Sequence, residues 1–200
     1  MKTSLKLLGA LGGLLMSLSA MAATFVEGKD YVRVEGFSES HTPVLREFFS
    51  YNCPHCFRMD HTIEEAVGLV AKEVRFERTP VGAGRNPWQM SQLAYYLAQK
   101  FNVTDQTHGA IFKQVQEVAP FQSEADVRQF FVSQGLKADE LDKAIASSDR
   151  KLAMMTFDTE AQLSGIRGVP SLLVNGKYML NIQGRSSAEI AELVQYLVKQ

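Results

Sequence analysis

The chain carries VLREFFSYNCPHC at residues 44–56, and this stretch decides how it folds. The first eight residues are mostly apolar, which is typical of a buried central strand. Cys53 and Cys56 follow at once, and they are the only two cysteines among 200 residues. Pro54 lies between them, at a position that the first turn of a helix tolerates. The stretch therefore predicts a strand that leads into a helix whose first turn carries a cysteine pair.

A cysteine at the start of a helix has a favoured thiolate. Its sulfur faces unpaired backbone N–H groups and the positive end of the helix dipole, and both stabilise negative charge. We expect the Cys53 sulfur to be exposed there, and Cys56, one turn further on, to be more buried. Cys53 is then the sulfur that a substrate thiolate attacks, and Cys56 is the resolving thiol. The reverse assignment is disfavoured because only the first sulfur faces the helix end.

Two other uses of the cysteine pair stay open. A purely structural disulfide is disfavoured, because stabilisation grows with the length of the closed loop and this loop is very short. A metal site is disfavoured, because zinc usually takes four ligands and the motif supplies two. The chain has no second C-x-x-C motif to complete such a site. We therefore expect a redox pair and no metal.

The first 22 residues predict a secretory signal peptide. Lys2 and Lys6 make a basic start, residues 7–18 are apolar, and residues 20–22 (Ala-Met-Ala) form a small-residue cleavage site. The mature chain then begins near Ala23, in a compartment where a disulfide can persist. A membrane anchor is the alternative, but the apolar run is too short for one. Loss of the two lysines changes the formal charge from −1 to −3, which argues against a nucleic-acid partner.

Strand and helix patterns divide the rest of the chain. Strand-like patterns occur at residues 31–34, 44–51, 74–79, 171–174 and 177–180. Residues 82–165 show no β-alternation and predict a block of amphipathic helices. Asn175-Gly176 is a strong hairpin signal between the last two strands. Ser186 and Glu189 have the spacing of a capping box that begins the final helix.

The order of these patterns is that of an α/β protein, a thioredoxin fold with an inserted helical domain. In this interpretation, residues 23–81 and 166–200 form a discontinuous thioredoxin-like domain after the signal peptide at residues 1–22. Residues 82–165 form the insert.

Three stretches resemble the DsbA family of periplasmic thiol:disulfide oxidants, in the thioredoxin-like superfamily. They are EFFSYNCPHC at residues 47–56, GVP at residues 168–170 and VNGKY at residues 174–178. The resemblance covers essentially the whole mature chain. It implies a periplasmic enzyme that donates its Cys53–Cys56 disulfide to folding exported proteins through a mixed disulfide. It also implies a DsbB-type membrane reoxidant and no dissociable cofactor, and we expect a monomer.

Pro54 and His55, between the cysteines, complete the predicted catalytic motif. A helix end alone lowers a thiol pKa by at most about 1.5 units. A strongly oxidising pair needs more stabilisation of its reduced form. We expect His55 to be the main further contributor, as an N–H donor or a cation beside Cys53. The backbone N–H groups of His55 and Cys56 come next.

Two further pairs of residues are implied by the resemblance. Val169 and Pro170 are expected to lie opposite the redox pair with a cis peptide bond, where Val169 offers backbone groups to an extended substrate. A trans proline at the start of a strand is the alternative. Glu47 is expected beneath the redox pair near Arg78, where it tunes the pair or accepts a proton from Cys56. The alternative for Glu47 is a structural salt bridge without a catalytic part.

Other readings of the sequence remain. His108 has no partner that the sequence identifies, so we expect it at the surface or on a helix face.

A reductase or isomerase on the same fold is the nearest rival function, although little of the chain precedes the first strand to hold a dimerisation domain. A metal carrier or chaperone is a rival of another class, whose affinity for metal or peptide would survive Cys53→Ser.

Overall fold

A computed structural model describes residues 24–37 and 42–200. The predicted signal peptide and its cleavage site lie outside the described residues. Over the described part of the chain, none of the helices combines the length and the apolar character needed to cross a bilayer.

Five strands form one mixed sheet in the order β1-β5-β4-β2-β3. The strands are β1 (Tyr31–Arg33), β2 (Val44–Phe49), β3 (Arg75–Pro80), β4 (Ser171–Val174) and β5 (Tyr178–Leu180). β2 pairs in parallel with β3 and antiparallel with β4, and β1 lies at the edge beside β5. All six residues of β2 are buried, including Arg46 and Glu47. The predicted central strand and edge strand are thus confirmed.

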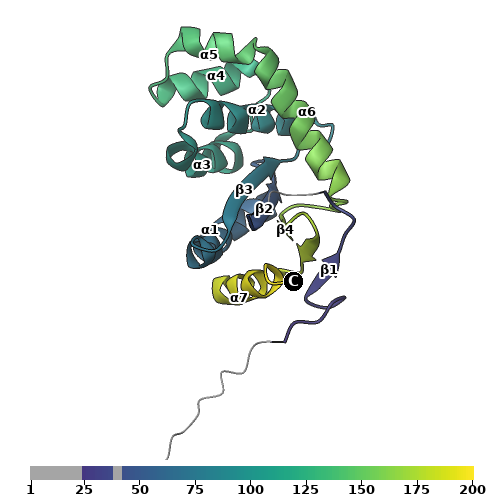
Figure 1. Ribbon diagram of the computed structural model, residues 1–200. Helices are drawn as coiled ribbons and strands as arrows, with labels where there is room; N and C mark the ends of the chain where they lie inside the picture. The colour runs from purple at the N-terminus through teal and green to yellow at the C-terminus, as the bar shows by residue number, and fades with distance from the viewer. Residues whose placement is uncertain (1–23, 38–41) are drawn as a thin grey trace, which may run out of the picture.

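Two helices of the sheet unit pack against each other. They are α1 (Pro54–Val70), which follows β2, and α7 (Ser187–Leu197), which ends the chain. Figure 1 shows both on the same side of the sheet. Their apolar stripes bury Ile63 and Leu193 in a core shared with β2 and β4.

A helical block connects β3 to β4 at the other end of the molecule (Figure 1). It consists of α2 (Asn86–Lys100), α3 (Thr104–Lys113), the π-helix η1 (Gln114–Val118), α4 (Glu124–Ser133), α5 (Ala138–Ile145) and α6 (Ser148–Leu163). Local signals explain several of their starts. Pro87 lies in the first turn of α2, and Ser123 and Asp126 form a capping box at α4. The predicted helices within residues 82–165 are present, while their division into a separate domain stays a prediction.

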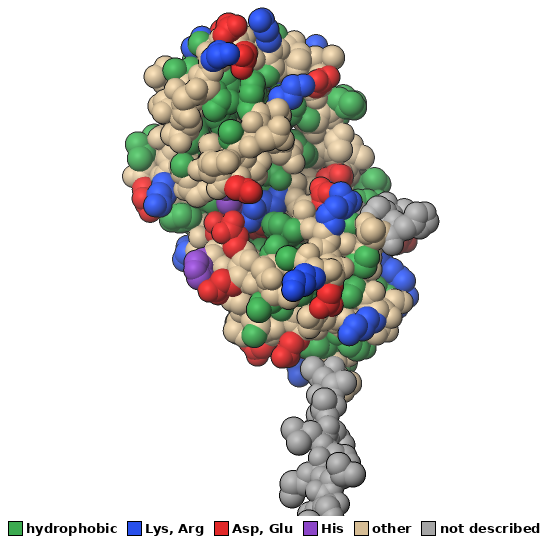
Figure 2. Space-filling model, turned by 60° about the vertical axis from the view of Figure 1, so that its left-hand side comes forward, with side chains coloured by type: hydrophobic (Ala, Val, Ile, Leu, Met, Phe, Trp, Pro, Cys, Tyr) green, Lys and Arg blue, Asp and Glu red, His purple; other side chains and the backbone are tan. Residues whose placement is uncertain are grey.

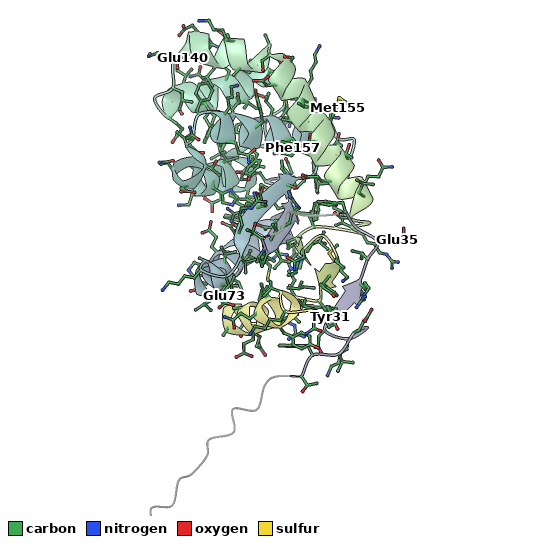
Figure 3. All side chains as sticks on the ribbon, in the orientation of Figure 1. Tyr31, Glu35, Glu73, Glu140, Met155 and Phe157 are labelled. Carbon is green, nitrogen blue, oxygen red and sulfur yellow. The ribbon has the colours of Figure 1, made fainter. Side chains whose placement is uncertain are left out.

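The helical block shares its core with the redox motif. Cys53 and Cys56 belong to the same buried cluster as Phe112 of α3 and Phe157 of α6. Figure 3 shows Phe157 pointing toward the other helices, whereas Met155 points away from them. At the end of α6, Glu160 accepts hydrogen bonds from Thr79 of β3 at 2.6 Å and from Arg46 of β2 at 3.0 Å. The block is therefore fixed to the sheet at the end where the cysteines lie.

The C-terminal hairpin and helix follow their sequence signals. Asn175 and Gly176 have positive φ angles of 52° and 66°, as the central residues of a tight turn closed by the Lys177 N–H to Val174 carbonyl bond. Ser186 accepts a hydrogen bond from the backbone N–H of Glu189, whose side chain accepts one in return from the N–H of Ser186. The predicted capping box is confirmed.

Ser186→Ala is expected to lower the free energy of unfolding by about 1 kcal/mol, because one backbone N–H at the start of α7 loses its acceptor. Chemical denaturation followed by circular dichroism measures the change. Ser186→Thr keeps the hydroxyl and serves as the matched control. Equal losses for the alanine and threonine variants would contradict the capping role.

Candidate active site

The Cys53 sulfur is the hydrogen-bond acceptor at the start of α1. Cys53 is the N-cap residue with an extended backbone, and its Sγ accepts a hydrogen bond from the backbone N–H of Cys56 at 3.2 Å. Pro54 occupies the first helical position, where its missing N–H costs no hydrogen bond. The predicted helix start, with the pair in its first turn, is confirmed.

Cys53 is less exposed than we expected. Its relative exposure is only 7%, whereas Cys56 is fully buried at 0%. The expectation of an exposed sulfur is therefore wrong, although the order of burial is as predicted. Cys53 lies in a cleft of about 410 Å³, which we call the thiol cleft. Its walls include Val81, Arg85 and Trp88 near the start of α2, and Arg167 and Val169 before β4.

The two thiols have opposite electrostatic environments. The pKa of Cys53 is lowered to about 6, first by a hydrogen bond from the Cys56 side chain, then by the backbone N–H groups of Cys56 and His55. Burial opposes this shift, and the charge of His55 is the smallest of the favourable contributions. Burial raises the pKa of Cys56, and its hydrogen bond to Cys53 raises it further. At neutral pH the stable reduced state is thus a Cys53 thiolate beside a Cys56 thiol.

The His55 side chain therefore contributes less to the lowered pKa of Cys53 than we expected. We expected its side chain to dominate the stabilisation of the thiolate, but the nearer Cys56 thiol and backbone donors contribute more. His55 is exposed, and together with Met59 and Pro170 it lines a second groove of about 420 Å³, the His55 groove. An exposed imidazole is screened by water, which explains its small contribution to the pKa of Cys53.

Val169 and Pro170 lie next to the sulfur from the start of β4. Their peptide bond is cis, as the resemblance implies. Cys53 Sγ lies 3.4 Å from the Val169 carbonyl oxygen, to which it donates a hydrogen bond when the thiol is protonated. Val169 lines the thiol cleft, and Pro170 lines the His55 groove. The structure thus brings these two residues to the redox pair.

Glu47 and Arg78 form a buried ion pair across β2 and β3. Arg78 Nε donates to Glu47 Oε2 at 2.9 Å, and the Glu47 side chain is 2% exposed. Burial raises the pKa of Glu47, although Arg78 opposes the shift. The negative charge of Glu47 also contributes to the raised pKa of Cys56. The contact is as we expected, while its role in tuning the pair stays a prediction.

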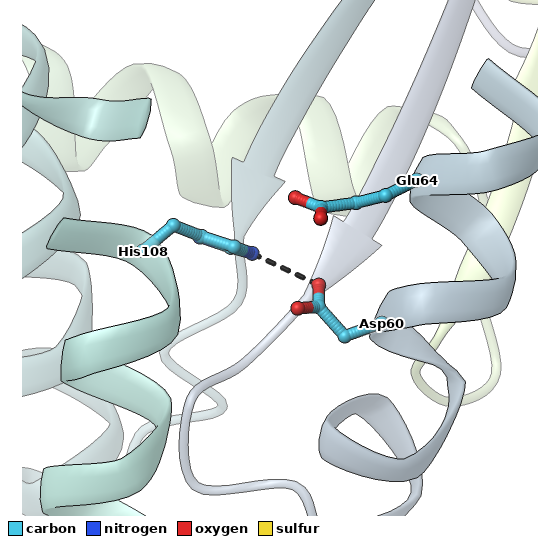
Figure 4. A group of neighbouring side chains, drawn as sticks. All are labelled: Asp60, Glu64 and His108. Carbon is cyan, nitrogen blue, oxygen red and sulfur yellow. Dashed lines mark hydrogen bonds and ion pairs between the residues drawn. The ribbon is translucent and has the colours of Figure 1, made fainter. Parts of the chain in front are cut away.

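His108 is a buried residue that the sequence analysis misplaced. It is 3% exposed, so the expectation of a surface histidine is wrong. Its Nε2 lies 3.0 Å from Asp60 Oδ1, the contact drawn in Figure 4, and its Nδ1 lies 2.8 Å from the Tyr51 hydroxyl. Burial raises the pKa of Tyr51 well above its usual value, so the Tyr51 hydroxyl keeps its proton. His108 thereby connects α3 to the turn before the redox motif and to α1.

Asp60, Glu64 and His108 bring their possible metal-ligand atoms within 4.8 Å of one another (Figure 4). Arg78 already supplies a positive charge to this group. Its Nη2 lies 3.2 Å from Glu64 Oε1 and 3.7 Å from Asp60 Oδ1. The arrangement is an ion-pair network around a guanidinium group, and a metal cation there would have to displace it.

The chain is similar to known thiol:disulfide interchange proteins. The DSBA-like thioredoxin domain family matches residues 70–195. The thiol:disulfide interchange protein DsbA of Escherichia coli strain K12 is 31% identical over 196 residues, covering 93% of this chain and 91% of that protein.

Solved structures give the same result. The oxidoreductase DsbA from Xylella fastidiosa superposes with a TM-score of 0.77 at 25% identity, covering 87% of this chain and 96% of that one. DsbA from Proteus mirabilis with a non-covalently bound peptide PWATCDS superposes with a TM-score of 0.72 at 28% identity, covering 89% of this chain and 100% of that one. These similarities confirm the predicted α/β thioredoxin fold.

Cys56→Ala is expected to raise the pKa of Cys53 from about 6 by roughly 1–2 units. The variant removes a hydrogen bond to a charged acceptor, which is worth about 1.5–3 kcal/mol. Cys56→Ser keeps an O–H donor and should leave the pKa of Cys53 near 6. The pH dependence of alkylation of Cys53 measures both. A larger shift in His55→Leu than in Cys56→Ala would overturn the order of contributions given above.

Arg78→Met is expected to lower the free energy of unfolding by about 3–5 kcal/mol, because Glu47 keeps a buried charge without its partner. The loss should be larger at pH 8 than at pH 5, since protonation of Glu47 removes that charge. Denaturant titration at both pH values measures it. The double variant Glu47→Gln/Arg78→Met is the control and should recover much of the stability. An equal loss in the double variant would argue against an unpaired charge as the cause.

Proposed function

Because the chain belongs to the DsbA family, we propose that it is a periplasmic dithiol oxidase, which gives its Cys53–Cys56 disulfide to folding exported proteins. Family membership makes the chain a thiol:disulfide oxidoreductase of disulfide-bond formation. The observation that carries the direction of transfer is the Cys53 sulfur at the helix start, with a pKa lowered to about 6. Stabilisation of a thiolate stabilises the reduced enzyme, and the disulfide form is then the stronger oxidant.

The reaction proceeds by two thiolate attacks. A client thiolate attacks Cys53 Sγ, the Cys53–Cys56 bond breaks, and Cys56 leaves and takes up a proton. A second client thiolate then attacks the client sulfur of the mixed disulfide, and Cys53 leaves as a thiolate. Two electrons pass from the client dithiol to the enzyme, and the client retains a disulfide. Release is fast because a thiol of low pKa is a good leaving group.

The assignment of roles follows the burial of the two sulfurs. Cys53 opens into the thiol cleft, whereas Cys56 is fully enclosed and can reach only its partner. Cys53 is therefore the sulfur that forms the mixed disulfide, and Cys56 resolves it. Pro54 holds the first turn, and His55 supports the thiolate through its backbone N–H. Glu47 and Arg78 lie beneath the cysteine pair and adjust the pKa values of its thiols, and Glu47 exchanges a proton with Cys56.

Val169 and Pro170 form the substrate-binding edge. Val169 presents its carbonyl beside the sulfur, so an extended client segment can add to this backbone as a short strand. The His55 groove, which Met59 and Pro170 line, offers a neighbouring surface for a client side chain or a partner loop. The relative from Proteus mirabilis has a non-covalently bound peptide, which supports a peptide as the ligand of this chain.

The remaining parts of the proposal concern the cell. The enzyme acts as a monomer after removal of the signal peptide at residues 1–22, with residues 82–165 as an inserted helical domain. A DsbB-type membrane protein reoxidises it. The redox disulfide is the only reactive group required, so neither a metal nor a dissociable cofactor takes part.

The reduced protein is expected to be more stable than the oxidised protein at pH 8. A folded-state pKa below the unfolded value stabilises the reduced form most above the unfolded pKa, and this contribution is lost as pH falls through about 6. The difference between the two forms should therefore shrink between pH 8 and pH 5. Thermal unfolding of both forms, and equilibration with glutathione buffers, measure it.

Catalysis is checked with a reduced peptide that carries two cysteines. The oxidised protein should convert it to the disulfide. Cys56→Ser with a small thiol attached to Cys53 as a mixed disulfide should pass that thiol group to one peptide cysteine, once, and be left with a free Cys53 thiolate. A reductase would show the opposite order of stability, with the oxidised form the more stable. A binding module would retain peptide affinity in Cys53→Ser and would oxidise nothing.

A further inference from the structure

We propose that Arg85 and Arg167 select client segments that carry aspartate or glutamate beside the reacting cysteine. The inference rests on the proposed function, because it concerns the peptide that reduces the Cys53–Cys56 disulfide. Arg85 comes from the loop before α2 and Arg167 from the loop before β4, and both line the thiol cleft with Cys53. Both residues are exposed, so their guanidinium groups are open to a bound chain.

The thiol cleft adjoins a second basic cleft. This edge cleft has a volume of about 590 Å³ and shares residues 166–169 with the thiol cleft. It adds Arg33 from β1, so the two linings together contain three arginines. Among the residues that the structure describes, neither lining includes an aspartate or a glutamate.

The charge of these clefts differs from that of the face shown in Figure 2. On the face shown in Figure 2, acidic and basic side chains are intermixed. The whole chain has a formal net charge of −1. The positive sign around Cys53 is therefore a local property, and a local field acts on whatever approaches the sulfur.

The three arginines have no carboxylate partner within residues 24–37 and 42–200. Arg85 lies over the ring of Trp88 at 5.4 Å, and Arg33 lies over the ring of Tyr178 at 5.4 Å. Such stacking holds a guanidinium group in place without neutralising its charge. Their charges are thus left for a ligand.

A client on the Val169 edge brings its side chains to these arginines. The client cysteine must come close to Val169, whose carbonyl oxygen lies 3.4 Å from Cys53 Sγ. Positions two residues apart on an extended chain are separated by about 7 Å. Side chains two positions before and after the client cysteine therefore extend into the two clefts. A carboxylate there can accept paired hydrogen bonds from a guanidinium group.

The arginines act on the client more than on the enzyme sulfur. The main groups that set the pKa of Cys53 are Cys56 and His55, and neither arginine is among them. Positive charge beside the client favours the thiolate of its attacking cysteine, and it attracts an acidic segment during encounter. A lysine-rich segment experiences the opposite effect. Because the arginines are exposed, the preference should weaken as salt is added.

The test uses three reduced peptides of equal length, each with the same two cysteines. Positions two residues before and after the first cysteine are aspartate, asparagine or lysine. Rapid-quench kinetics with alkylation gives the second-order rate of oxidation of each peptide by the oxidised protein. The aspartate peptide should react about three- to ten-fold faster than the lysine peptide at low ionic strength. The difference should shrink at high ionic strength.

The variants separate this inference from the basal reaction. Arg85→Gln/Arg167→Gln should oxidise the aspartate and lysine peptides at nearly equal rates, with the pKa of Cys53 unchanged. Lys113→Gln/Lys151→Gln removes the same charge from exposed positions outside both clefts and should keep the preference. Equal rates for the three peptides with the unchanged protein overturn the selection while the oxidase function stands. Failure to oxidise any peptide overturns the oxidase function, and the selection with it.

Discussion

The hydrogen bond from the Cys56 backbone N–H to the Cys53 sulfur is the interaction on which the site depends. Helices with a side-chain N-cap usually begin with an oxygen acceptor, whereas here the acceptor is a sulfur that also takes part in thiol–disulfide exchange. A thiolate is a better acceptor for the free backbone N–H groups at the start of α1 than a sulfur in a disulfide, because only the thiolate carries a full negative charge. The redox state of the pair and the stability of the helix are thus linked through one atom.

The surroundings of the pair maintain this asymmetry. The helical block and the sheet share one core around Cys53 and Cys56, so the second sulfur has no access to water and remains a thiol. Beneath it, Arg78 compensates the carboxylates of Glu47, Asp60 and Glu64 in a single network. His108 joins that network to α3 through Asp60. The helical block therefore covers the sulfur pair and contacts the ion-pair network beneath it through His108.

The sequence predicted those features that depend on neighbouring residues. The helix start at Pro54, the turn at Asn175 and the capping box at Ser186 are each encoded within a few positions, and each is present. His108 was misplaced because its partners Tyr51 and Asp60 lie 57 and 48 positions away in the chain. The low exposure of Cys53 was missed for a similar reason. The walls of its cleft come from the loops before α2 and β4, and no local pattern shows that these loops meet.

Trp88 is the only tryptophan of the chain, and it shares a cleft with Cys53. Its indole ring is covered by the guanidinium group of Arg85 and lines the cleft that contains Cys53. All of the indole fluorescence of this protein therefore originates within the cleft where electrons are exchanged. An emission spectrum of the unlabelled protein consequently samples this cleft alone, free of background from other indoles.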